Sequence, residues 1–184
     1  MHNNLFRSLD NTDLRWSHVG PQHERAYFNL LDLVGYAPAK WGVDQPPYKI
    51  YNPYRWTGEK VPEGKTYATI PVAKRAARAL VLSWLSQAGT GPVVWEDTDT
   101  GVHFWAHADG LEIAKMYFCP EKKGNWHKDF RVWFGGTYYI VDFANPEEAK
   151  AAVADTWSQW LAIAKERLLI VPNVSRQGRR EGEA

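Results

Sequence analysis

The sequence predicts an α+β protein, in which an antiparallel sheet of about five strands (residues 91–143) packs against a long C-terminal helix (residues 145–169). Three observations support this class. Residues 145–169 have the apolar spacing of an amphipathic helix, residues 91–143 contain turn-separated strand segments, and strands that run consecutively before a helix are typical of α+β folds. The N-terminal half, residues 21–90, is expected to be helical and irregular.

The C-terminal helix has the clearest local signals. Asn145 is a favourable N-cap, Pro146 suits the first helical position, and the next two residues are glutamates, which the positive end of the helix dipole stabilises. The apolar residues at three- and four-residue spacing are Ala149, Val153, Trp157, Trp160, Ala164 and Leu168. We expect this stripe to lie on the sheet that precedes it.

Turn signals divide residues 91–143 into strands. A turn at residues 98–101 separates PVVWED from VHFWAHA, and Asp109-Gly110 is a two-residue hairpin signal that leads into LEIAKMYF. Gly135-Gly136 joins WHKDFRVWF to TYYIVDF. An antiparallel meander is therefore expected.

The N-terminal half is predicted to contain two helices separated by a loop. Residues 21–35 are expected to form the first helix, with Gly20-Pro21 before it, Gly35 as its stop, and Tyr27, Leu30, Leu31 and Val34 on one face. Residues 36–65 are rich in Pro, Tyr and Trp, so we expect a long loop there, with one short strand at Tyr48–Tyr51. A second helix should begin at Ile70-Pro71 and end at Gly89.

Domain organisation follows from the same pattern. We expect a flexible arm (residues 1–20), one domain (residues 21–171, with halves 21–90 and 91–171) and a disordered tail (residues 172–184). A weak internal similarity relates Trp84-Leu85 to Trp160-Leu161, which indicates two similar strand-to-helix units.

Composition limits the classes of function. Across 184 residues the formal charge is only +1, so attraction to nucleic acid has to come from local patches. The single cysteine excludes an intramolecular disulfide and a cysteine-rich zinc site. The N-terminus lacks the apolar core of a signal peptide, and no apolar run reaches the roughly 20 residues of a membrane span, so we expect a cytoplasmic protein without a membrane partner.

Two basic segments favour a non-catalytic protein that binds nucleic acid. The first interleaves cations with aromatic residues, and its candidate contacts are Lys115, Lys128, Arg131 and Trp133. The second is the flank of the helix after Ile70, where Lys74, Arg75 and Arg78 oppose the helix dipole and so indicate an anionic partner. No residue is assigned a catalytic role, and no cofactor is expected.

Two alternatives stay open. Tyr54, Arg55 and Trp56 favour a protein-binding inhibitor or adaptor, for example a phage- or plasmid-encoded protein that acts on a host defence or regulatory protein. His103, His107 and Asp109 fall on one strand face at period two and could hold a metal, which would indicate a metal-dependent enzyme.

A nuclease-like pair of carboxylate and lysine is also considered. Glu112 and Lys115 would supply it, but their separation of three residues is expected to place the two side chains on opposite faces of a strand.

The segment YYIVDFANPEEAKAAVADT resembles the last strand and helix of the integrase-type DNA-binding domain, in which three antiparallel strands precede a helix. The shared features are an aromatic residue (Phe143) before the cap, an acidic pair in the first helical turn, and an alanine-rich helix. The resemblance covers about 50 residues and implies that Lys128, Arg131 and Trp133 face DNA. The family's glycine before that aromatic residue is absent here.

Overall fold

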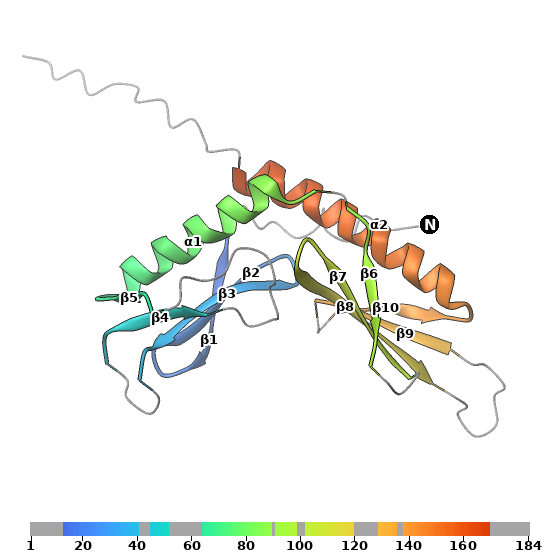
Figure 1. The fold of residues 1–184 in the computed structure, drawn as a ribbon, viewed down its shortest axis with the longest axis horizontal. Coiled ribbons are helices and arrows are strands. Elements are labelled where there is room, and N and C mark those ends of the chain that lie inside the picture. The colour runs from blue at the N-terminus through green and yellow to red at the C-terminus, as the bar shows by residue number, and fades with distance from the viewer. Residues whose placement is uncertain are drawn as a thin grey trace, which may run out of the picture.

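The computed structural model describes residues 13–40, 45–51, 64–89, 91–98, 102–119, 129–135 and 138–169. In these ranges the chain forms two antiparallel five-stranded sheets and two long helices (Figure 1). Sheet A comprises β1 (Arg15–Gly20), β2 (His23–Phe28), β3 (Leu31–Pro38), β4 (Tyr48–Tyr51) and β5 (Thr66–Tyr67), and α1 (Ile70–Gln87) follows it. Sheet B comprises β6 (Val94–Asp97), β7 (His103–Ala108), β8 (Leu111–Cys119), β9 (Asp129–Phe134) and β10 (Tyr138–Phe143). It is followed by α2 (Pro146–Ala164), which continues into a π-helical turn, η1 (Lys165–Leu169).

The predicted C-terminal half is confirmed. Sheet B is a meander in the order β10-β9-β8-β7-β6, and α2 contacts its strands β8, β9 and β10. The side-chain oxygen of Asn145 accepts a hydrogen bond from the backbone N–H of Glu147 at 2.8 Å, so the expected N-cap is formed. The predicted apolar stripe is buried at Val153, Trp157 and Trp160.

The prediction of a helix at residues 21–35 is wrong, and the N-terminal half is mostly strands. Residues His23–Phe28 alternate between half-buried and buried positions, which is the period of a strand. Asn29 and Leu30 then adopt positive φ angles of 40° and 79°, which turn the chain tightly into β3. The apolar spacing around Leu30 has a helical period only because it crosses this turn.

Other predictions for the N-terminal half have mixed outcomes. The short strand at Tyr48–Tyr51 and the helix that begins at Ile70 are confirmed. Gly35 lies inside β3, where it pairs with Tyr51. The second part of the predicted arm contains β1, while residues 1–12 and the predicted tail at 172–184 lie outside the described residues. Within the described ranges, neither α1 nor α2 has both the length and the apolar content that crossing a membrane requires.

The two halves repeat one structural unit, a five-stranded meander followed by a helix. The match extends to residue pairing. In β2 and β3 the pairs are Ala26↔Val34, Tyr27↔Asp32 and Phe28↔Leu31. In β7 and β8 the pairs are Ala106↔Ala114, His107↔Glu112 and Ala108↔Leu111. Leu33 and Ile113 are therefore the extra residues of equivalent β-bulges, one in each half.

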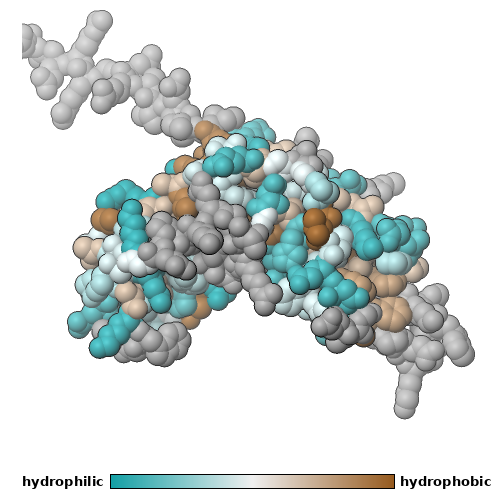
Figure 2. All heavy atoms as spheres, in the orientation of Figure 1, coloured by the Kyte–Doolittle hydropathy of each residue, from teal (hydrophilic) through white to brown (hydrophobic). Residues whose placement is uncertain are grey.

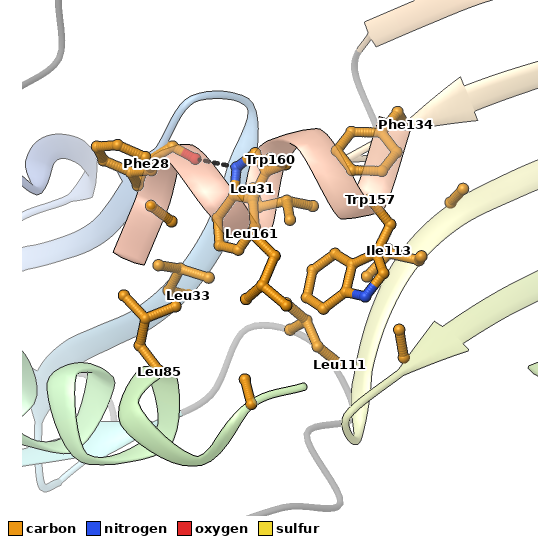
Figure 3. Close-up of a cluster of buried hydrophobic side chains, with 14 of the residues drawn as sticks. Phe28, Leu31, Leu33, Leu85, Leu111, Ile113, Phe134, Trp157, Trp160 and Leu161 are labelled. Carbon is orange, nitrogen blue, oxygen red and sulfur yellow. Dashed lines mark hydrogen bonds between the residues drawn. The ribbon is translucent and has the colours of Figure 1, made fainter. Parts of the chain in front are cut away.

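The helices join the halves through reciprocal tryptophan contacts. Trp160 on α2 donates its indole N–H to the carbonyl oxygens of Phe28 and Asn29 in the hairpin of sheet A, each at 3.0 Å (Figure 3). Trp84 on α1 donates to the carbonyl oxygen of Asp109 in the equivalent hairpin of sheet B, at 3.1 Å. Such a reciprocal arrangement is what a two-fold axis produces between identical subunits. Here it is approximated within one chain.

The two sheets and the two helices share one large hydrophobic core. It contains Leu31 and Leu33 from sheet A, Leu111 and Ile113 from sheet B, and Trp157 from α2 (Figure 3). Because the core draws on both sheets and both helices, the two halves hold each other in fixed positions.

Candidate functional site

Each sheet has one face against its helix and one face that points away from it. Alternate residues of a strand point to opposite faces, and paired residues on neighbouring strands share a face. In sheet B the buried side chains of Ala106, Met116, Val132 and Phe134 belong to the helix-facing side. The face that points away from α2 is here called face B. Its described side chains include Glu96, His103, Trp105, His107, Glu112, Lys115, Tyr117, Arg131 and Trp133.

A row of aromatic and basic side chains crosses the centre of face B. Lys115 pairs with Trp105 on one side and with Trp133 on the other, so these three residues lie on adjacent strands in register. The ammonium nitrogen of Lys115 lies 4.9 Å from the ring centroid of Trp105, which is a cation–π contact. All three side chains are half-buried, as expected at the middle of a sheet face.

A second row lies beside the first. Tyr117 pairs with His103 and with Arg131. The rings of His103 and Tyr117 meet edge to face with their centroids 4.8 Å apart. The structure therefore brings together Lys115, Arg131 and Trp133 of the predicted contacts, whereas Lys128 lies outside the described residues.

The expectation that Glu112 and Lys115 lie on opposite faces is wrong. A carboxylate oxygen of Glu112 lies 3.4 Å from the ammonium nitrogen of Lys115. The bulge at Ile113 is the reason, because one extra residue in the strand turns an odd spacing into an even one. Glu112 has only 8% of its side chain exposed. It pairs across the strands with His107, whose Nε2 lies 3.4 Å from a carboxylate oxygen of Glu96. Carboxylates thus lie beside Lys115 and on the β6 edge of face B.

The predicted metal triad is not assembled. Asp109 is not on the strand face but in the hairpin turn, with a φ of 46°. Its carboxylate accepts a hydrogen bond from the backbone N–H of Gly89 at 3.1 Å. His103 and His107 share face B, but at four residues along one strand they are about 13 Å apart. Among the described residues, no three His, Cys, Asp or Glu side chains are grouped so that they could hold a metal ion.

The basic flank of α1 is partly engaged in ion pairs. Lys74 pairs with the buried carboxylate of Glu24, and its ammonium lies 4.9 Å from the ring centroid of Trp16. Arg78 lies 3.2 Å from the carboxylate of Asp13. These carboxylates offset the unfavourable placement of cations near the helix N-terminus. Of the three, only Arg75 is exposed, and Figure 1 shows α1 along the top of the molecule with the sheets below it.

The face of sheet A that points away from α1 is called face A. The sequence does not predict it, because the apolar spacing of residues 21–35 indicates a helix. Its described side chains include Arg15, His23, Arg25, Tyr27, Asp32, Lys49 and Tyr51. The alternation at the end of HERAYF, where Arg25 and Tyr27 alternate with Ala26 and Phe28, is the signal that could have revealed it.

Two pairs of polar side chains interact on face A. Nε2 of His23 and the hydroxyl of Tyr51 share a hydrogen bond, and a guanidinium nitrogen of Arg25 lies 3.6 Å from the carboxylate of Asp32. Burial lowers the pKa of His23, and the charge of Arg25 lowers it further. Burial also raises the pKa of Tyr51. Both side chains are therefore neutral at physiological pH.

The described surface on the side shown in Figure 2 is mostly hydrophilic, with hydrophobic residues in small, separated groups. The large hydrophobic side chains that are exposed include Val19, Val72 and Val94, which lie on three different elements. Apolar residues scattered in this way are normal on a protein surface and do not by themselves mark a binding site. The predicted protein-binding residues Tyr54, Arg55 and Trp56 lie outside the described residues.

No protein-family model, curated protein or solved structure matches this chain. The order of elements that the integrase-type domain implies, three antiparallel strands and then a helix, is present in β8, β9, β10 and α2, inside a five-stranded sheet. The candidate site is therefore defined by geometry, as an aromatic and basic platform on face B.

Proposed function

We propose that this protein is a non-catalytic binding protein that holds single-stranded nucleic acid on face B. The observation that carries the proposal is the row Trp105–Lys115–Trp133, in which a cation lies between two indole rings on adjacent strands. Unpaired bases stack on aromatic side chains, and the phosphates between them attract cations. A sheet face backed by a helix can present both groups to one strand at once.

The aromatic content favours a single strand over a duplex. In a duplex the base faces are occupied by stacking, and sequence is read through hydrogen bonds to base edges in the grooves. Trp105, Trp133 and Tyr117 offer ring faces or edges at partly exposed positions, which unpaired bases can use.

The charges on face B predict the orientation of the ligand. Arg131 and Tyr117 lie in the row that is farther from Glu112. Glu96 lies on the edge strand β6, where it pairs with Trp105. Phosphates should therefore contact the Lys115 and Arg131 side of the platform. With two cations in contact, the logarithm of the affinity should fall with the logarithm of salt concentration with a slope of about −1.4 for a single strand.

Binding of labelled oligonucleotides, measured by fluorescence anisotropy, tests the proposal. Single-stranded RNA and DNA are compared with a duplex of the same sequence at about 50 and 200 mM salt. Trp133→Ala should weaken single-strand binding by about 5- to 150-fold, which corresponds to the loss of one stacked base. Lys115→Glu should weaken it too and should reduce the salt dependence.

Arg75→Glu makes the same change of charge on the flank of α1, the other basic segment that the sequence predicts to contact an anionic partner. The proposal requires this variant to bind as the original protein does. If Arg75→Glu weakens binding as much as Lys115→Glu, the flank of α1 is the contact instead of face B. If the unaltered protein binds none of the oligonucleotides but retains a protein from host extract at both salt concentrations, the protein-binding alternative takes the place of this proposal.

A further inference from the structure

We infer that face A is a second contact for single-stranded nucleic acid, so that one molecule holds two segments of a strand. The inference rests on the function proposed for face B. It is carried by the equivalence of the two halves, which places one aromatic residue and one cation at the same two positions of both faces.

The register of strand pairing defines the equivalence. Ala26 pairs with Val34 and Ala106 with Ala114, so Gly35 and Lys115, the next residues in β3 and β8, are equivalent. Gly35 pairs with Tyr51, and Lys115 pairs with Trp133. Tyr51 therefore occupies on face A the position of Trp133 on face B.

A cation accompanies the aromatic residue on both faces. Lys49 precedes Tyr51 by two residues in β4, and Arg131 precedes Trp133 by two residues in β9. Because side chains two apart on a strand share a face, each cation lies beside its aromatic residue. The pair of aromatic residue and cation that we propose as a base and phosphate contact is thus present twice.

The ring of Tyr51 lies across β3. A Cβ atom at Gly35 would collide with the far end of that ring, so the absence of a side chain at Gly35 lets the ring lie over the backbone. Its hydroxyl reaches His23 on β2. The hydrogen bond between the two residues holds the ring in place, and a pre-positioned ring costs less entropy when a base stacks on it.

Face A has the stronger positive charge. Its described side chains include three cations, Arg15, Arg25 and Lys49, against the one carboxylate of Asp32. On face B, Lys115 and Arg131 are balanced by Glu96 and Glu112. Arg15 and Lys49 are exposed. Face A therefore attracts phosphates more strongly than face B does, while both faces offer a ring on which a base can stack.

Both faces belong to one rigid molecule. The two sheets share a core, and Figure 1 shows both helices along one side, so the faces that point away from the helices are not separated by them. A strand that reaches both faces gains affinity from the high effective concentration of its second segment, by a factor of about 10² to 10⁴ in favourable geometry.

Stoichiometry and length dependence test the inference. The probes are oligothymidylates of about 6 and about 30 nucleotides, chosen to fill one face or to reach both. Isothermal titration should give two short oligonucleotides for each protein molecule. The long oligonucleotide should bind with a ratio of one to one, at least tenfold more tightly than the short one.

Two variants test whether the second segment of the nucleic-acid strand binds at face A. Lys49→Glu changes an exposed side chain, so folding should be preserved, and Tyr51→Ala removes the ring. Each variant should bind only one short oligonucleotide per protein molecule. Each should also bind the long oligonucleotide no more tightly than the short one. Lys150→Glu makes the same change of charge on α2, outside both faces, and should change neither quantity.

The outcomes separate this inference from the function on which it rests. The inference is overturned if the unaltered protein binds one short oligonucleotide per molecule and Lys49→Glu behaves like Lys150→Glu. If Trp133→Ala still weakens binding in that case, the proposed function stands. If the unaltered protein binds neither oligonucleotide, both are wrong.

Discussion

Replacing Trp160 with Phe should destabilise the protein strongly, because this side chain joins α2 to the hairpin of sheet A. Trp160 is fully buried, and its indole N–H donates to two backbone carbonyl oxygens, those of Phe28 and Asn29. Both residues are themselves buried, so water cannot replace the donor without opening the core.

The size of the effect follows from two losses. Leaving buried carbonyl groups without their donor costs about 1–3 kcal/mol. The smaller ring of Phe leaves a space of roughly 40 Å³, which at about 24 cal/mol per Å³ adds about 1 kcal/mol. We therefore expect Trp160→Phe to lower the free energy of unfolding by about 2–4 kcal/mol.

Guanidinium denaturation followed by far-ultraviolet circular dichroism measures this change. Trp95→Phe is the matched control, since Trp95 lies on the edge strand β6 and is only partly buried, and it should cost less than about 1 kcal/mol. If the two variants lose the same free energy of unfolding, the contact between Trp160 and the hairpin of sheet A does not hold the two halves together.

Two further predictions concern stability. Gly135→Ala should lower the free energy of unfolding by several kcal/mol in denaturation experiments, because a Cβ atom there would overlap with the carbonyl of Leu30. Gly64 has a similar positive φ but open space around it, so Gly64→Ala should cost only about 1 kcal/mol. Equal losses would contradict the close approach of β9 to the hairpin of sheet A. The lowered pKa of His23 means that the folded protein resists protonation there, so stability should fall as the pH drops through the ordinary histidine pKa of about 6.5 toward the lowered value. The difference in unfolding free energy between about pH 7.5 and pH 5.5 should be smaller in His23→Gln, and an unchanged difference would show that His23 is not the group responsible.

Local sequence signals predict the elements that depend only on near neighbours. The cap at Asn145, the tryptophan spacing of α2 and the Asp109-Gly110 turn are fixed by backbone chemistry within a few residues, and each is confirmed. For the same reason the order of strands in sheet B could be predicted. The equivalent turn of sheet A was missed because Asn29 and Leu30 carry its positive φ angles without the glycine that marks such turns in a sequence.

Only the tertiary structure decides which side chains meet. Glu112 reaches Lys115 because a bulge, a property of two paired strands, shifts the face of one residue, and no periodicity along a single strand contains that information. The repeat of the two halves is a second case in which the sequence does not predict the contacts. Trp84-Leu85 and Trp160-Leu161 indicate two similar helices, but only the packed core shows that each tryptophan binds the hairpin of the other half. Such long-range contacts are set by how much surface the whole chain can bury, and not by the residues next to them.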